Sequence, residues 1–350
     1  MKIYPLMVLL MIGSLHGLLA QSTSDQVSLE SIWLRYEFYP NGPSAFRWME
    51  DDQYYSVLAE GTGIDRYNIQ SGQKVDAILD FAQLSGEVPE TVESYEFAEG
   101  EQQLLLASQT ESIYRRSSQE FVYVADRSSK KVQAIRSGEK IINAAFSPDG
   151  SKVGFVLDNN VYFTDLANGA ETQVTTDGKR NEIINGLTDW VYEEEFAFVD
   201  AFKWSPDGKK IAFYRFDESA VREFQMPIYG SLYPDPYVFK YPKAGEDNAV
   251  VSIHIYDLDS GKTTTVDIGE ETDQYIARIK WVNDNTLGLM RLNRLQNQLD
   301  LLMADAATGA SRTFLTETSD TYIREATDDK WHFLESGELI WQSEMEGYNH

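Results

Sequence analysis

The sequence predicts an all-β protein, a β-propeller built from four-stranded blades, and two observations carry this prediction. Short runs of alternating residues, such as KVGFVL and KIAFYRF, are bounded by Gly, Asp, Asn or Pro, as strands and turns are. In addition, a similar unit recurs along the chain, and a repeat of ~40–50 residues with four strands is typical of propellers. Stacked β-sandwiches, which also have short strands at regular intervals, are the alternative.

Each repeat is marked by an aromatic residue that precedes a turn and a strand. In the two clearest copies the turn is S-P-D-G, which favours a type I or II turn. Segments such as YDLDSGK recur once per unit and predict a hairpin between two strands of a blade. Subtracting successive marker positions gives spacings of 49, 49, 58, 77 and 52, so the two long spacings indicate insertions. The six markers are Trp48, Phe97, Phe146, Trp204, Trp281 and Phe333.

Length, charge and cysteine content exclude several classes of function. The chain has 350 residues and is 42% hydrophobic, so it can bury a large core. It carries 30 Lys and Arg against 56 Asp and Glu, a net charge of -26. This disfavours binding to nucleic acid or to an anionic membrane surface, which both need basic residues. The absence of Cys excludes a lipoprotein anchor, a disulfide framework and a thiol nucleophile.

Residues 1–20, MKIYPLMVLLMIGSLHGLLA, combine an early Lys, an apolar stretch and Ala20 before the polar QSTSDQ. This pattern predicts a signal peptide that is cleaved after Ala20 and followed by a propeller domain over residues 21–350. The mature protein would then be secreted or periplasmic. A retained membrane anchor is the alternative interpretation of the same stretch. No later stretch is long enough to cross a membrane.

The first insertion contains the run DWVYEEEF, residues 189–196, in which strand alternation stops. Asp189 suits a helix N-cap, so we expect a short helix with Glu193, Glu194 and Glu195 near its start, where the backbone dipole favours anions. The simplest interpretation is an acidic first turn that faces water. A cation site is the alternative, because two adjacent glutamates, pointing ~100° apart, can straddle one target. A Lys side chain or the α-ammonium of a peptide would fit.

The run GLTDWVYEEEF, the following WSPDGKKIAFYRFDE and the segment YPKAG resemble the propeller domain of dipeptidyl peptidase IV-type serine peptidases, which are prolyl oligopeptidase-like. The resemblance extends from about residue 28 to the end of the chain. It implies that Glu194 and Glu195 bind the N-terminal ammonium of a peptide, and that Glu193 is less suited to this role. Arg115, in the segment YRRS, would hold the carbonyl of the residue before the cleaved bond. Arg116 stands where the family often has His.

The family's fold and activity are further expectations from the resemblance. It implies an eight-bladed propeller that gates access to an α/β-hydrolase domain, in an enzyme that removes dipeptides with Pro or Ala in second place from free peptide N-termini. It also implies a homodimer formed through an arm at residues 222–245. A tripeptidyl aminopeptidase is an alternative, because a shift of the ammonium-binding glutamates by one residue along the bound peptide changes the length of the released product. A non-catalytic propeller that binds a peptide or protein is another.

The residues for catalysis are missing from the chain. The family's Ser-Asp-His chemistry needs a G-x-S-x-G elbow, and GPSAF and GASRT both lack the closing Gly. His254, in the run VSIHIYDL, is expected to be a half-buried structural residue. The six markers correspond to about six of the eight expected blades, so we expect the propeller part of a larger peptidase. No metal or cofactor is expected, because no Cys/His spacing suits zinc and the acidic loops MEDDQ and VNDNT are better explained as turns.

Overall fold

The computed structural model describes residues 27–39, 46–59, 61–324, 330–334 and 336–350. They belong to two compact units, Met1–Phe46 and Arg47–His350. The first unit contains a single-turn π-helix, η1 (Glu30–Leu34), and the predicted signal peptide lies outside the described residues. In the part of the chain that is described, no helix has both the length and the apolar character needed to cross a membrane.

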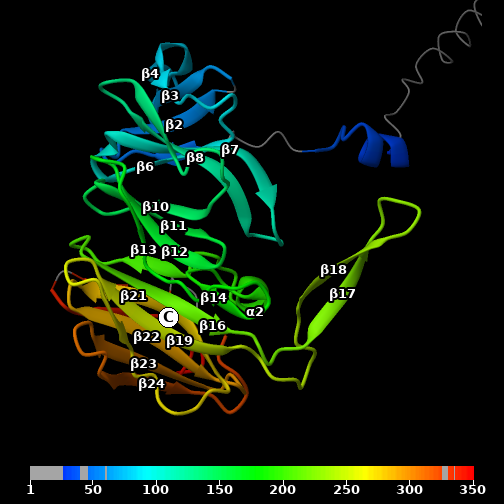
Figure 1. The fold of residues 1–350 in the computed structure, drawn as a ribbon, viewed down its shortest axis with the longest axis vertical. Helices are drawn as coiled ribbons and strands as arrows, with labels where there is room; N and C mark the ends of the chain where they lie inside the picture. Colours follow the sequence, from blue (N-terminus) through cyan, green and yellow to red (C-terminus); the bar gives the residue numbers. More distant parts are fainter. Residues whose placement is uncertain (1–26, 40–45, 60, 325–329, 335) are drawn as a thin grey trace, which may run out of the picture. The chain divides into compact units, whose positions relative to one another are not determined.

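The second unit is built from sheets that follow one another along the chain (Figure 1), and all of their strand pairs are antiparallel except that of β5 with β9. Short 3-10 turns, η2 (Phe81–Gln83) and η3 (Glu99–Glu101), lie before β5 and β7. The strands of the first three sheets are β1 (Phe46–Trp48), β2 (Tyr54–Ala59), β3 (Gly63–Asn68) and β4 (Lys74–Asp80); β5 (Ser85–Gly86), β6 (Ser94–Phe97), β7 (Gln103–Ser112), β8 (Ser118–Asp126) and β9 (Lys131–Ile135); and β10 (Ile142–Phe146), β11 (Lys152–Leu157), β12 (Asn160–Asp165) and β13 (Glu171–Gln173).

Three later sheets in the chain are also formed by strands that lie close together in sequence. The last of them, β25–β26, has two described strands. The strands are β14 (Ile183–Asn185), β15 (Phe202–Trp204), β16 (Lys210–Asp217), β19 (Val250–Asp257) and β20 (Lys262–Thr265); β21 (Gln274–Asn283), β22 (Thr286–Asn293), β23 (Gln298–Asp305) and β24 (Ser311–Thr318); and β25 (Trp331–Phe333) and β26 (Leu339–Trp341).

The observed sheets confirm the all-β prediction and the blade period on which it rests. Each of the six marker aromatics lies on a strand that pairs with the next strand of its own sheet, from Trp48 on β1 to Phe333 on β25. The segment YDLDSGK forms the hairpin between β19 and β20, as predicted, and its counterpart at residues 303–311 joins β23 to β24. The aromatic spacing therefore identified one strand in each described sheet other than the two-stranded hairpin of the second insertion.

The two S-P-D-G turns have the same hydrogen bonds in two different sheets. Ser147 Oγ donates to Asp149 Oδ1 at 2.6 Å and accepts from the backbone N–H of Lys152 at 2.9 Å. In the copy that begins at Ser205, both distances are the same. The closing glycines, Gly150 and Gly208, adopt φ +67°, a conformation that costs little only for Gly. The side chains of Ser and Asp therefore determine this turn locally.

Both long marker spacings contain insertions, as predicted. The first holds α2 (Trp190–Glu195), and the second holds a hairpin of β17 (Glu223–Ile228) and β18 (Asp235–Lys240), whose strands pair only with each other (Figure 1). We call residues 222–245 the arm. Every residue of β17 is exposed, whereas β18 becomes buried towards its end, at Phe239.

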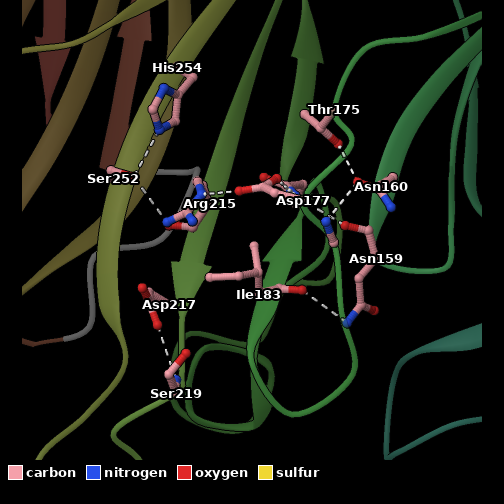
Figure 2. A network of polar contacts seen from close by, with 12 residues as sticks. Asn159, Asn160, Thr175, Asp177, Ile183, Arg215, Asp217, Ser219, Ser252 and His254 are labelled. Carbon is pink, nitrogen blue, oxygen red and sulfur yellow. Dashed lines mark hydrogen bonds and ion pairs between the residues drawn. The ribbon is translucent and has the colours of Figure 1, made fainter.

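Polar contacts fix β14, the strand just ahead of α2, to its neighbours (Figure 2). Asp177 accepts hydrogen bonds from Arg215 Nε at 2.8 Å and from Asn185 Nδ2 at 2.9 Å. Asn159 Nδ2 donates to the carbonyl of Ile183 at 3.1 Å. Because these contacts connect residues of the third and fourth sheets, they hold the start of the first insertion in place. A hydrophobic core connects this part of the chain to the later sheets, from Val156 on β11 to Trp331 on β25.

Candidate functional site

The run DWVYEEEF folds as the expected short helix, capped by the expected residue. Asp189 Oδ1 accepts the backbone N–H of Tyr192 at 2.9 Å, which satisfies one of the free donors at the helix start. The Asp189 carboxyl is buried, and burial raises its pKa to about 7. The prediction for the glutamates is wrong in one respect. The helix ends at Glu195, so Glu194 and Glu195 lie in its last turn, where the dipole does not favour anions.

The helix α2 is attached to β21 at two points. The hydroxyl of Tyr192 accepts the backbone N–H of Ile276 at 2.8 Å, and Arg278 Nη2 donates to the carbonyl of Phe196 at 2.6 Å. Tyr192 is 2% exposed and packs edge-on against Phe216, with the ring centroids 4.9 Å apart. Tertiary contacts therefore stabilise this single helical turn, which would be marginal by itself.

The three consecutive glutamates have three different environments. Glu193 is 1% exposed, and its Oε1 atom accepts the backbone N–H groups of Arg116 at 2.7 Å and Ser117 at 2.9 Å. Glu194 is partly buried, and Glu195 is exposed. The acidic first turn facing water, our simplest interpretation, is therefore wrong for Glu193, because this side chain points into the protein and holds a loop. The helical rotation of ~100° per residue separates the other two from it.

Arg115, a predicted site residue, lies beside the glutamates although it is distant in sequence. Its Nε atom is 3.1 Å from Glu194 Oε1 and 3.0 Å from Glu194 Oε2. The Arg115 side chain is 70% exposed and that of Glu194 is 18% exposed. Glu195 has no ion pair among the residues that the structure describes, and the Arg116 side chain is exposed. One cation and one unpaired carboxylate thus flank Glu194.

The chemistry that this arrangement supports is the binding of a cation with several N–H donors. Two ionised carboxylates can make short, charge-assisted hydrogen bonds to an ammonium group. Arg115 reduces the repulsion between them and presents further donors, which suit a carbonyl oxygen. In the described part of the chain, no cluster of three or more acidic, His or Cys side chains could hold a metal ion.

The sequence did not reveal the aromatic contacts made by the two segments that carry this site. Tyr114, directly before Arg115, and Trp190, at the start of α2, both contact the arm, through Phe239 and Tyr241 respectively. The available signal was the alternation of Tyr237, Phe239 and Tyr241, which places three rings on one face of β18 and its extension.

Ser252 and His254 resemble the serine–histidine pair of a hydrolase, but their contacts are those of structural residues. Ser252 Oγ lies 2.9 Å from His254 Nε2 (Figure 2), while the other ring nitrogen lies 3.2 Å from the Thr265 hydroxyl rather than from a carboxylate. The ring stacks on Phe213 with the centroids 5.4 Å apart. Burial, helped by the charge of Arg215, lowers the His254 pKa to about 4. The histidine is thus neutral and half-buried, as expected from its strand.

Comparisons with known proteins agree with this fold. Residues 98–350 match the family described as the dipeptidyl peptidase IV (DPP IV) N-terminal region. The crystal structure of Porphyromonas gingivalis dipeptidyl peptidase 4 superimposes with a TM-score of 0.87 and 36% identity, over 93% of this chain and 47% of that chain. The fold is therefore that of a peptidase propeller. The chain belongs to the dipeptidyl peptidase IV N-terminal region family.

Curated relatives include both a peptidase and an inactive protein. Dipeptidyl aminopeptidase B of Saccharomyces cerevisiae is 29% identical over 81% of this chain and 33% of its own length. Inactive dipeptidyl peptidase 10 of Rattus norvegicus is 33% identical over 53% of this chain and 24% of its own length. The chain spans about half of the solved structure and a quarter to a third of these relatives. The family is one of serine dipeptidyl peptidases, and this chain corresponds to its N-terminal region.

Proposed function

We propose that this chain is the substrate-gating, N-terminus-binding propeller of a secreted or periplasmic serine dipeptidyl aminopeptidase. Glu194 and Glu195 bind the α-ammonium of a peptide, and Arg115 holds the carbonyl of the residue before the cleaved bond. The observation that carries the proposal is the ion pair between Arg115 and Glu194, beside Glu195, whose carboxylate forms no ion pair with the residues that the structure describes. Family membership supports it.

The ammonium site, which we call the anchor, would determine the length of the released product. An extended chain advances ~3.3–3.6 Å per residue, so the bond after the second residue lies ~7 Å from the ammonium. A peptide with a blocked amine lacks the anchor. The preference for Pro or Ala in second place is part of the proposal, and so is a tripeptidyl variant of the same device.

The proposal extends to the arm. Residues 222–245 expose apolar and aromatic side chains, among them Tyr229, Leu232 and Tyr233 at 81%, 89% and 81%. Large exposed aromatic residues are enriched in protein interfaces. A homodimer formed through this arm would bury them.

The experiment compares the tripeptide Ala-Pro-Ala with its N-acetylated form in calorimetric titrations of the 350-residue chain. The free amine should bind and the acetylated peptide should not. Glu195→Gln should weaken binding, whereas Glu99→Gln, the same change at an exposed turn, should not. Equal binding of both peptides would reject the ammonium anchor.

A non-catalytic propeller is the second candidate, and one relative is itself named an inactive dipeptidyl peptidase. The reading frame downstream of this chain in its gene separates the two. A G-x-S-x-G elbow there supports the peptidase, and its absence supports a binding protein.

A further inference from the structure

The base of the arm contacts both segments that carry the candidate site. Phe239 on β18 lies 5.9 Å from Tyr114, and Tyr241 lies 4.3 Å from Trp190, measured between ring centroids. Phe239 and Tyr241 are 6.0 Å apart. Because Tyr114 precedes Arg115 and Trp190 begins α2, a row of four rings connects the arginine loop to the glutamate helix through the arm.

This row of rings is packed rather than loosely apposed. Phe239 is 6% exposed. Burial raises the pKa of Tyr114, and the neighbouring Tyr237 contributes to the same shift. Arg180 Nη2 donates to the carbonyl of Val238 at 3.1 Å, and its guanidinium lies 5.4 Å from the ring centroid of Tyr237. The base of the arm is therefore held from two sides.

Hydrogen bonds also join the two sides of the base of the arm. Lys240 Nζ donates to the carbonyl of Val221 at 2.7 Å, and the backbone N–H of Tyr241 donates to the carbonyl of Arg222 at 3.0 Å. These bonds close the hairpin where it leaves the fourth sheet. An aromatic ring on the base of the arm consequently has a defined position relative to that sheet, whereas the side chains at the tip are exposed.

We propose that Phe239 and Tyr241 are positioning residues for the ammonium site, and that they set the separation between Arg115 and the carboxylates of Glu194 and Glu195. The inference rests on the proposed function. The Arg115 loop is joined to α2 directly by the two bonds that Glu193 accepts and by the exposed Arg115–Glu194 pair. The aromatic row is a second, apolar connection on the side of the arm, and it also links the proposed dimer surface to the site.

The test uses the 350-residue chain with Ala-Pro-Ala and N-acetyl-Ala-Pro-Ala as probes, and measures Kd by calorimetry. Tyr241→Ala should weaken binding of the free-amine peptide by about 2- to 10-fold, the expected loss of one aromatic pair. Tyr241→Phe, which keeps the ring, should restore wild-type affinity. Tyr322→Ala, which removes a ring that is 65% exposed, is the matched control and should change nothing. A melting curve of each variant accompanies the titrations.

The outcomes separate the two proposals. If Tyr241→Ala keeps the wild-type preference for the free amine while its melting temperature falls, the ring has only a structural role and the inference is wrong. If Tyr241→Ala does not fold, Trp190→Leu removes the same ring pair from the helix side and decides the question by the same titration. If the wild-type chain binds both peptides equally, the proposed function itself fails.

Discussion

Arg115 and Glu194 form an ion pair in which the arginine Nε lies 3.0 Å from the glutamate Oε2, although 79 residues separate them in sequence. The pair lies at the surface, with the arginine side chain 70% exposed. Exposed pairs contribute little to stability, about 0–1 kcal/mol. The pair therefore contributes little to the stability of the fold, and in the function that we propose its role is to present Arg115 and Glu194 to a ligand.

The first prediction concerns catalysis in the whole peptidase, with this chain joined to the hydrolase domain that we propose. Glu194→Gln, Glu195→Gln and Arg115→Ala should each lower kcat/KM. Loss of a charged hydrogen bond costs about 1.5–3 kcal/mol, which corresponds to about 10- to 150-fold. Melting temperatures should stay close to that of the wild type. Unfolded Gln variants whose folded fraction keeps full activity would contradict the anchor.

The second prediction separates Glu193 from its neighbours. Glu193→Ala removes the acceptor for the N–H groups of Arg116 and Ser117, and unsatisfied buried donors cost about 1–3 kcal/mol. Urea unfolding should show a loss of this size. Glu193→Gln keeps a carbonyl acceptor and should be milder. An Ala variant as stable as the wild type would show that the loop does not depend on this contact.

The third prediction is a pH dependence of the free energy of unfolding that arises at Glu218, which is 6% exposed. Burial, and then the charge of Asp189, raise its pKa from 4.5 to about 7. Lys240 and Arg180 oppose this shift, and Asp217 adds to it. Because the pKa is raised in the folded state, the contribution of Glu218 to the free energy of unfolding is fully present below pH ~4.5. It is lost as the pH rises through ~7.

Glu218→Gln cannot ionise, so its advantage over the wild type should be absent at pH 4.5 and reach about 1–3 kcal/mol at pH 8. Thermal unfolding of both proteins across this range measures the difference. The control, Glu99→Gln, should show no such trend. A Gln variant whose advantage is greatest in acid would reverse the sign and reject the explanation.

The fourth prediction concerns assembly. Deleting residues 228–240 from the whole peptidase should yield monomers, because the deletion removes the exposed rings that we propose to lie in the dimer contact. Light scattering measures the mass. An unchanged dimer mass would mean that the arm folds against its own protomer or another partner.

The fifth prediction concerns export. N-terminal sequencing of the exported protein should begin at or near Gln21, because the apolar stretch ends at Ala20. Recovery of exported protein that still begins with Met1 would favour the retained anchor.

Much of the fold could be predicted because its signals are local. The marker aromatics, the S-P-D-G turns and the hairpin between β19 and β20 each depend on a few neighbouring residues and their backbone preferences. The N-cap at Asp189 is local in the same sense. The site residues Glu194, Glu195 and Arg115 came from the resemblance to a family, since no local pattern connects positions so far apart.

The sequence by itself determined the repeat, the positions of its strands and the place where a helix interrupts them. Only the tertiary structure decided that three adjacent glutamates differ, with Glu193 holding a loop, Glu194 paired with Arg115, and Glu195 free of any ion pair to the described residues. It likewise decided that Phe239 and Tyr241 contact Tyr114 and Trp190, which belong to the two segments that carry the site residues. The physical reason is that burial and pairing depend on which distant segments meet, and side chains ~100° apart on one helical turn meet different neighbours.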